Sequence, residues 1–207
     1  MNNSPICYIV GAGDFCERLT PRAYDTVIAA DGGYDALVRI GVRPDLLIGD
    51  LDSLGYVPKD VEILRYPVEK DETDTALAYL VGYERGYRNF EVFGGTGGRI
   101  DHTIANYCLL LRAKLNGAEM TLTGDGTRAR VIMGGESLTL HGKEGASVSL
   151  FAFGGEAEGV TIEGLKYTVQ GVTISPEIPL GVSNSHTAKG EGRISLLGGA
   201  LLVIEEI

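Results

Sequence analysis

The feature that most constrains the fold is a pattern repeated along residues 1–133, in which a short apolar run ends in glycine or aspartate. Ile6–Val10 ends in this way at Gly11, and Thr26–Ala30 ends at Asp31. The remaining runs with strand character are Asp45–Ile48, Val61–Tyr66, Phe90–Phe93, Met120–Thr123 and Ala129–Met133. Continuous apolar runs of this length are typical of buried parallel strands.

Helical spacing of apolar residues fills two of the gaps between these strands. One helix is predicted over Glu72–Arg85. A second helix carries Ile104, Cys108, Leu111 and Leu115 in one stripe, of the kind that faces a core. Because strands and helices alternate, the sequence predicts an α/β domain with a mostly parallel, Rossmann-like sheet covered by helices on both faces.

After residue 133, helical periodicity gives way to short β-rich runs. In chain order these are Ser137–His141, Ala146–Phe153, Val160–Glu163, Lys166–Val169, Gly171–Ser175, Ser183–Thr187, Arg193–Leu197 and Ala200–Glu205. Their regular spacing predicts a small antiparallel β-sandwich. Gly198 and Gly199, between the last two runs, predict a tight hairpin. We therefore expect two domains, an α/β domain over residues 1–133 and a β-sandwich over residues 134–207.

Charge and targeting signals limit the function classes. The formal net charge is −10, and a surface this acidic repels nucleic acid and anionic membranes. No apolar run reaches membrane-spanning length, and the N-terminus lacks the pattern of a signal peptide. Cys7, Cys16 and Cys108 lie among apolar residues without a CxxC pair, so we expect buried free thiols in a cytoplasmic protein.

Acidic residues follow one strand at the edge where open α/β sheets bind ligands. The segment Gly49–Ser53 (GDLDS) places Asp50 and Asp52 two positions apart, so their carboxylates can point the same way. Two such groups are suited to hold a hard cation such as Mg²⁺. The alternative is a polar turn in which Asp52 or Ser53 caps a backbone group.

The segment Lys70–Asp74 (KDETD) opens the first predicted helix. Asp71 is placed to cap this helix, with Asp74 in its first turn, where a carboxylate suits the helix dipole. In a second interpretation one of these acids caps while the other reaches into a site, and both interpretations can hold together. Asp31 either caps the following helix or joins the acidic group.

The segment Phe93–His102 (FGGTGGRIDH) is the most informative. Its glycines follow a strand and precede a helix, so backbone N–H groups at a positive helix end are suited to phosphate. Arg99 adds a guanidinium that can contact phosphate oxygens in a bidentate way. The alternative is a flexible turn in which Asp101 caps the helix. Gly11–Asp14 is only a weak dinucleotide-like motif, and we interpret it as a tight turn.

Taken together, these segments resemble the thiamine pyrophosphokinase family. The matching segments are DGG at Asp31–Gly33, PDLLIGDLDS at Pro44–Ser53, EKDETD at Glu69–Asp74, FGGTGGRIDH at Phe93–His102 and SN at Ser183–Asn184. They extend over most of the chain, and GDLDS, KDETD and GGRIDH in this order are specific. The resemblance implies an α/β domain followed by a β-sandwich, in agreement with the strand and helix pattern.

The resemblance also implies an activity, pyrophosphoryl transfer from ATP to thiamine to give thiamine diphosphate and AMP, with Mg²⁺ required. It implies a homodimer with active sites between subunits. The residues it places near the metal and triphosphate are Asp50, Asp52, Asp74, Asp31 and Asp71, of which the first three would hold Mg²⁺. It places Gly95, Thr96, Gly97, Gly98, Arg99 and His102 at ATP. It places Asp101 at thiamine, with Ser183 and Asn184 from the partner subunit.

Because the chain has no Trp, any aromatic stacking on thiamine must come from Tyr or Phe.

Two other function classes use the same residues. One is a metal-dependent phosphatase or another nucleotide-dependent transferase, which the nucleotide product distinguishes. The other is a sensor that binds a nucleotide or thiamine without turnover, against which the number of carboxylates argues.

Overall fold

The computed structural model describes residues 4–15, 19–51, 54–67, 69, 71–124 and 126–207. The chain divides into two compact units, Met1–Asp125 and Gly126–Ile207. The boundary expected from the sequence lies after residue 133. The difference is strand β7 (Thr127–Met133), which pairs along its whole length with β14 (Ala200–Glu206) of the second unit. Among the described residues, no helix combines the length and apolar character needed to cross a membrane.

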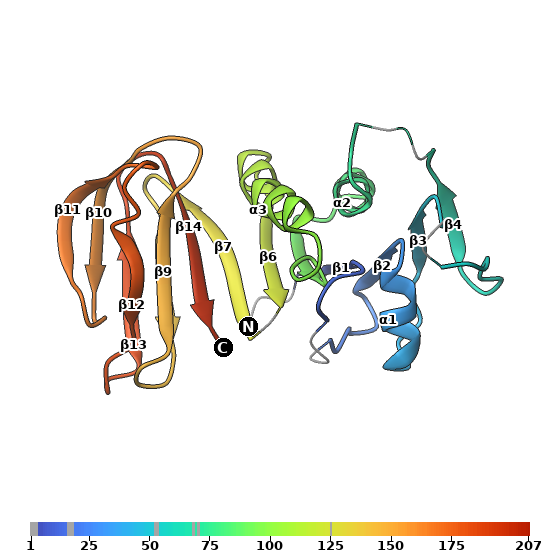
Figure 1. Cartoon of the computed structure of the whole chain (residues 1–207), viewed down its shortest axis with the longest axis horizontal. Helices are drawn as coiled ribbons and strands as arrows, with labels where there is room; N and C mark the ends of the chain where they lie inside the picture. The colour runs from blue at the N-terminus through green and yellow to red at the C-terminus, as the bar shows by residue number, and fades with distance from the viewer. Residues whose placement is uncertain (1–3, 16–18, 52–53, 68, 70, 125) are drawn as a thin grey trace. The chain divides into compact units, whose positions relative to one another are not determined.

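The first unit is built on a parallel sheet in the order β6-β5-β1-β2-β3-β4 (Figure 1). The strands are β1 (Cys7–Val10), β2 (Thr26–Ala30), β3 (Leu46–Gly49), β4 (Glu62–Arg65), β5 (Asn89–Phe93) and β6 (Glu119–Gly124). β1 and β3 are buried along their whole length, as expected for strands covered on both faces. The predicted parallel α/β sheet is therefore confirmed.

Helices cover both faces of this sheet. They are α1 (Gly33–Arg39), α2 (Asp74–Glu84) and α3 (Ile100–Leu115); α2 and α3 lie on one side of the sheet and α1 on the other (Figure 1). Alternate side chains of β1 meet opposite layers. Tyr8 and Val10 share a cluster with Leu37 of α1, whereas a Cβ added to Gly82 of α2 would lie 2.9 Å from the Cys7 sulfur.

The buried face of α3 differs from the predicted stripe. The helix buries Asn106, Leu109, Leu110 and Ala113. Ile104 is 56% exposed and Leu115 is 63% exposed. The stripe was misidentified because one of the inward positions is the polar Asn106. The prediction of buried thiols is confirmed for Cys7 and wrong for Cys108, which is exposed, while Cys16 lies outside the described residues.

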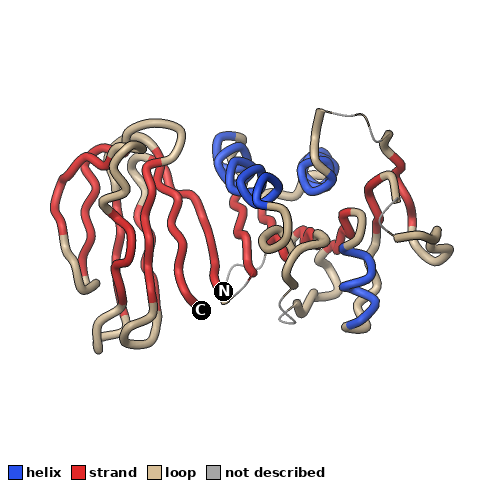
Figure 2. Tube along the Cα trace, in the orientation of Figure 1, coloured by secondary structure: helices blue, strands red, loops and turns tan. Residues whose placement is uncertain are grey.

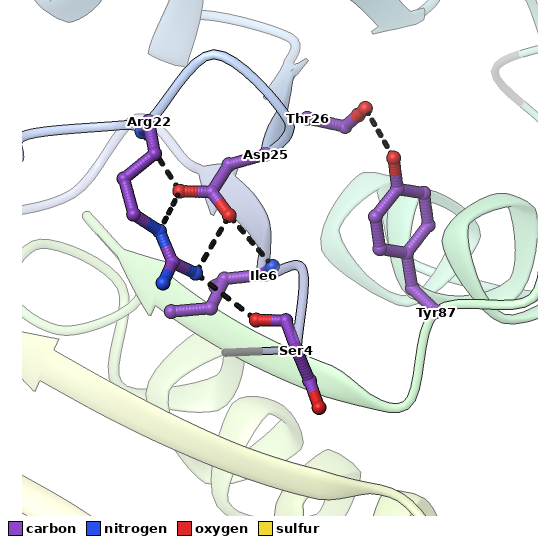
Figure 3. Close-up of polar contacts among 6 residues, drawn as sticks. All are labelled: Ser4, Ile6, Arg22, Asp25, Thr26 and Tyr87. Carbon is purple, nitrogen blue, oxygen red and sulfur yellow. Dashed lines mark hydrogen bonds and ion pairs between the residues drawn. The ribbon is translucent and has the colours of Figure 1, made fainter. Parts of the chain in front are cut away.

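The buried carboxylate of Asp25 connects the segments that lead into β1 and β2. The Asp25 side chain has no exposed surface. It accepts hydrogen bonds from the N–H of Ile6 at 2.9 Å and from the N–H and guanidinium of Arg22 at 2.8–2.9 Å (Figure 3). Arg22 also donates to the Ser4 carbonyl oxygen at 3.0 Å. Although desolvation acts in the opposite direction, these hydrogen bonds hold the pKa of Asp25 below its usual range.

The second unit is a β-sandwich (Figure 2). One layer has the strand order β12-β9-β14-β7 and the other β11-β10-β13-β8. The strands not yet given are β8 (Ser137–His141), β9 (Ser147–Ala152), β10 (Ala157–Glu163), β11 (Val169–Ile174), β12 (Gly181–Ser185) and β13 (Glu191–Ser195). One apolar cluster takes side chains from both layers, among them Leu150 and Val203 from one and Ile162 and Ile194 from the other. The predicted antiparallel sandwich is confirmed.

Two details of this unit differ from the sequence prediction. Lys166–Val169 and Gly171–Ser175 are not separate strands, because β11 continues from Val169 to Ile174. Gly198 and Gly199 do not close a hairpin, since β13 pairs with β8 and β10 while β14 pairs with β7 and β9. The glycines instead carry the chain from one layer to the other.

Candidate active site

The candidate site lies where the order of the parallel strands reverses. β2, β3 and β4 follow β1 on one side, and β5 and β6 lie on the other. In such sheets, ligands bind in the crevice at the carboxyl ends of the strands that flank the reversal. The two loops at that place are Gly11–Asp14, after β1, and Gly94–Gly98, after β5.

Backbone hydrogen bonds join these two loops. The N–H of Gly13 donates to the Gly94 carbonyl oxygen at 2.8 Å, and the N–H of Asp14 donates to the Thr96 carbonyl oxygen at 2.7 Å. A Cβ added to Gly13 would lie 2.2 Å from the Thr96 carbonyl oxygen. Only glycine permits this close approach of two backbones. The motif interpreted as a tight turn is therefore fixed against the loop after β5.

The loop after β5 presents donors that the rest of the described chain does not use. Gly97 and Gly98 adopt left-handed φ angles of 74° and 71°. No group in the described ranges accepts a hydrogen bond from the N–H of Thr96, Gly97 or Gly98. Consecutive N–H groups of this kind, just before a helix begins, form a concavity that suits an anion. Phosphate binding at this loop stays a prediction.

Contacts with neighbouring elements hold the loop after β5 in place. The buried Asn106 Nδ2 donates to the Gly95 carbonyl oxygen at 2.8 Å. Thr96 is 9% exposed, and its Oγ1 has no hydrogen-bond partner among the described residues. A Cβ added to Gly124 would lie 2.5 Å from that oxygen. A buried hydroxyl without a partner is costly in a folded protein, which makes Thr96 a candidate ligand contact.

Asp31 follows β2 in a strained conformation. Its φ angle is 47°, and its N–H donates to the Ile48 carbonyl oxygen at 2.8 Å. Its Oδ1 is buried and finds no partner within the described part of the chain. Gly49 lies against it, since a Cβ there would be 3.1 Å from the Asp31 Cβ. The α1 N-cap is Gly32 and receives no side-chain hydrogen bond, so Asp31 does not cap this helix.

Asp50 follows β3, the neighbour of β2, and is partly buried. The next residue, Leu51, is 6% exposed with a φ angle of 68°. A left-handed conformation is unfavourable for leucine, and strain of this kind is concentrated at functional sites. Asp52 and Ser53 lie outside the described residues. The pairing of Asp50 with Asp52 therefore stays a prediction.

The start of α2 corrects one predicted cap. The N-cap is Thr73, whose Oγ1 accepts from the Ala76 N–H at 3.2 Å, so Asp71 is not the cap and is exposed ahead of the helix. Thr73 is the cap because it directly precedes the first helical residue, Asp74, and from there its hydroxyl reaches the N–H of Ala76 at position N3. The first turn lies near the crevice, since a Cβ on Gly11 would be 3.7 Å from Thr75 Oγ1.

Arg99 and Asp101 contact each other at the start of α3. The Arg99 guanidinium donates to the Asp101 carboxylate at 2.6 and 3.1 Å, and the N–H of His102 donates to Asp101 Oδ1 at 3.0 Å. The Arg99 hydrogen bond lowers the pKa of Asp101. Both side chains are mostly exposed. A phosphate and a cationic substrate would therefore compete with this ion pair for the two groups.

The donor set fits a magnesium ion in its chemistry. Asp31 and Asp50 follow adjacent strands, and carboxylate oxygens are the ligands that Mg²⁺ prefers. Asp31 Oδ1 is buried and has no hydrogen-bond partner among the described residues, so a bound cation would stabilise it. Among the described residues, which leave out Asp52, no three acidic, histidine or cysteine side chains are grouped closely enough to hold a metal ion.

The remaining predicted residues belong to the second unit. Ser183 is exposed, has a φ angle of 62°, and its N–H donates to Ser149 Oγ at 3.2 Å. Asn184 is 5% exposed. The β12–β9 register shifts between Gly181 and Asn184. Ser183 is therefore exposed while Asn184 is buried, next to an irregularity of the kind that changes the direction of side chains.

Asp14 is a further candidate that the sequence analysis did not single out. A Cβ added to Gly97 would lie 2.0 Å from Asp14 Oδ2, so this carboxylate lies directly against the loop whose N–H groups have no acceptor among the described residues. The signal was present in the sequence: Asp14 follows Gly11-Ala12-Gly13 at the end of the first strand. Because the segment was interpreted only as a weak match to the dinucleotide-binding motif, its position at the carboxyl end of a strand was not taken into account.

Comparison with known proteins identifies relatives for both units. Residues 19–122 match the thiamin pyrophosphokinase catalytic domain, and residues 137–201 match the thiamin pyrophosphokinase vitamin B1 binding domain. A thiamine pyrophosphokinase of Bacillus subtilis (strain 168) is 27% identical over 183 residues, covering 86% of this chain and 85% of that protein.

Solved structures agree with these matches. A thiamin pyrophosphokinase from Geobacillus thermodenitrificans is 26% identical, with a TM-score of 0.82 over 98% of this chain and 97% of that one. The yeast enzyme, at 17% identity, has a TM-score of 0.74 over 100% of this chain and 88% of its own, which shows the shared fold. The catalytic-domain match alone spans half of the residues, and the chain belongs to the thiamin pyrophosphokinase family.

Proposed function

We propose that this protein transfers the pyrophosphoryl group of ATP to thiamine, giving thiamine diphosphate and AMP. The observation that best supports this is the loop at the strand reversal. There the N–H groups of Thr96, Gly97 and Gly98 have no acceptor within the described ranges, and carboxylates follow the neighbouring strands. A polyphosphate fits the donors, and a cationic acceptor fits the acidic surroundings. ATP handling falls to the first unit, and thiamine binding and dimerisation to the second.

In this proposal the loop after β5 holds the phosphate chain. The N–H groups of this loop, which have no acceptor among the described residues, bind its oxygens, and donors fixed in the backbone give the preorganisation that phosphate transfer requires. Arg99 adds a bidentate contact once it leaves Asp101. Asp101, released in the same exchange, becomes free to attract the positively charged thiamine.

The carboxylates Asp50, Asp52 and Asp74 would hold Mg²⁺, with Asp31 and Asp71 nearby. When bound, Mg²⁺ neutralises and orients the phosphate oxygens. Holding it is the means by which an acidic protein with a net charge of −10 accepts a polyanion. Asp50 contributes from the end of β3, and Asp74 from the first turn of α2.

The reacting atoms are the primary hydroxyl oxygen of thiamine and the β-phosphorus of ATP. A new O–P bond forms, the bond from the β-phosphorus to the α,β-bridging oxygen breaks, and AMP leaves with that oxygen. The hydroxyl proton passes to a carboxylate. Asp31, with its unpartnered Oδ1, and Asp74 are the candidates for this proton acceptor. The chain's main contribution is alignment of the two substrates.

Identification of the nucleotide product tests the proposal. The purified protein is incubated with ATP, Mg²⁺ and thiamine, and the nucleotides are separated and identified. AMP that forms only in the presence of thiamine supports the proposal. ADP would indicate a phosphoryl transferase, thiamine-independent hydrolysis would indicate a phosphatase, and binding of both ligands without any product would indicate a sensor. EDTA should abolish AMP formation if Mg²⁺ is required.

We also propose that the protein is a homodimer with active sites at the subunit interface. The second unit exposes the large apolar side chains of Ile178 and Leu197, which favours their further burial in an assembly. Mixing two inactive variants, Asp50→Asn and Ser183→Tyr, tests it. If each site takes Asp50 from one subunit and Ser183 from the other, subunit exchange should restore about a quarter of wild-type activity. Sites contained in single subunits would give no recovery.

A further inference from the structure

The second unit contains an apolar pocket that the proposed mechanism has not used. Its lining includes Tyr167, Val169, Leu180, Val182 and Asn184. Tyr167 is 59% exposed, Leu180 64% and Val182 42%. Large apolar side chains gathered around one pocket, with a few polar groups, are typical of a small-molecule site. All of them lie within the residues that match the vitamin B1 binding domain.

The Asn184 side chain spends its hydrogen bonds on the backbone of Tyr167. Its Oδ1 accepts from the N–H of Tyr167 at 3.0 Å and from the N–H of Ser185 at 2.9 Å. Its Nδ2 donates to the Tyr167 carbonyl oxygen at 2.7 Å. The peptide groups on both sides of Tyr167 are thus held by one amide that is 5% exposed.

This arrangement leaves little of Asn184 for a ligand. Its Oδ1 already accepts two hydrogen bonds, which is the capacity of a carbonyl oxygen. Removing the amide would leave two partly buried backbone groups without their partner and release the segment before β11. Direct contact with thiamine, as the family resemblance implies for this position, is therefore a poorer use of the residue than control of Tyr167.

The surroundings of the Tyr167 ring favour an uncharged partner. Lys166 Nζ lies 5.3 Å from the centroid of the ring and occupies one of its faces. A second cation on the opposite face would gain less, because the lysine already interacts with the same ring electrons. Thiamine offers two rings, a cationic thiazolium and a neutral aminopyrimidine. The neutral ring is the better match for this pocket.

We infer that Asn184 is a positioning residue, which holds Tyr167 as the aromatic wall of a pocket for the aminopyrimidine ring of thiamine. This inference rests on the proposed function and adds to it which residue touches the substrate and which one acts through a neighbour.

The absence of tryptophan from the chain allows a direct test. A Tyr167→Trp variant carries the only indole, and its fluorescence should change on addition of thiamine and of an aminopyrimidine alcohol, but not of the thiazole alcohol. A matched Tyr24→Trp variant, which also replaces an exposed tyrosine, should not respond. A response to the thiazole alcohol alone, or none to thiamine in a variant that still forms AMP, would overturn the inference.

The role of Asn184 is tested by a double-mutant cycle on thiamine affinity. Asn184→Ala and Tyr167→Ala should each weaken thiamine binding roughly three- to tenfold, and the double variant should be no weaker than Tyr167→Ala. The KM for ATP should stay unchanged in all three. Additive losses would mean that Asn184 contacts the substrate itself, and would overturn the positioning role.

Two measurements keep this test decisive. If Asn184→Ala does not fold, Asn184→Asp retains both acceptor bonds and loses only the donor to Tyr167, and the same cycle applies. Wild-type turnover distinguishes a failure of the proposed function from a failure of the further inference. A wild-type protein that forms no thiamine-dependent AMP refutes the proposed function. Normal wild-type turnover with an additive cycle refutes only the further inference.

Discussion

Replacing Gly13 by alanine should damage the nucleotide site without touching any polar side chain. A Cβ there would lie 2.2 Å from the Thr96 carbonyl oxygen and 2.7 Å from that of Gly94. Both obstacles are backbone atoms, and Thr96 would have to retreat by about 1 Å to reach an ordinary contact. Misplacement on this scale can reduce catalysis on the order of 100-fold.

The same contact sets the cost in stability. Overpacking against backbone that cannot rotate away costs about 3 kcal/mol, and we expect Gly13→Ala to lower the free energy of unfolding by this amount. Gly41→Ala is the matched control. Gly41 has a φ angle of 73° and nothing within 4 Å of an added Cβ, so only the left-handed strain of roughly 1–2 kcal/mol applies.

Urea unfolding and steady-state kinetics decide between these expectations. Gly13→Ala should unfold at lower urea than Gly41→Ala, with a raised KM for ATP and a lowered kcat, whereas Gly41→Ala should keep wild-type kinetics. If Gly13→Ala instead unfolds with the control and retains its KM for ATP, the two loops are not interlocked as described, and the crevice at the strand reversal is not the nucleotide site.

Three further predictions concern Asp52, Arg99 and Asp25. Asp52→Asn should reduce turnover at least about 100-fold while the thermal unfolding curve stays that of wild type, because one ligand charge is lost at a preorganised site; near-normal activity would remove Asp52 from the metal. Arg99→Ala should raise the KM for ATP several-fold more than the KM for thiamine, and the reverse pattern in initial-rate kinetics would contradict its assignment to phosphate. Asp25 has a lowered pKa in the folded state, so its contribution to stability is present above the unfolded pKa and is lost as the pH falls through the folded pKa. Stability profiles measured from neutral to acidic pH should therefore be flatter for Asp25→Asn than for wild type, and parallel profiles would refute this.

The sequence predicted the layers of this fold well, because they depend on patterns that burial enforces. β2 and β8 have the expected bounds, and the strands of both units were recognised from apolar runs. α1 was expected only as a helix that follows Asp31, without bounds, since seven residues beginning with glycine carry too little periodicity to define a helix. Its existence depends on packing of Leu37 against the sheet.

The sequence could place the candidate residues in the fold better than it could give their individual contacts, and their roles stay predictions. Asp31, Asp50 and the loop after β5 follow strands of one sheet, as expected, because parallel strands bring their carboxyl ends to one edge. The competition between Thr73 and Asp71 for the α2 cap, and the use of Asn184 on the backbone of Tyr167, depend on distances of a few ångströms. No periodicity or motif encodes such distances, so these roles became visible only in the structure.

The hydrogen bonds between the loops after β1 and β5 have a consequence for divergence. They run from main chain to main chain, so they make no demand on side-chain chemistry beyond small residues at the points of contact. Most other positions around the crevice can then drift without moving it. A fold held in this way can persist in chains that share only 26% of their residues, as the relative from Geobacillus thermodenitrificans illustrates.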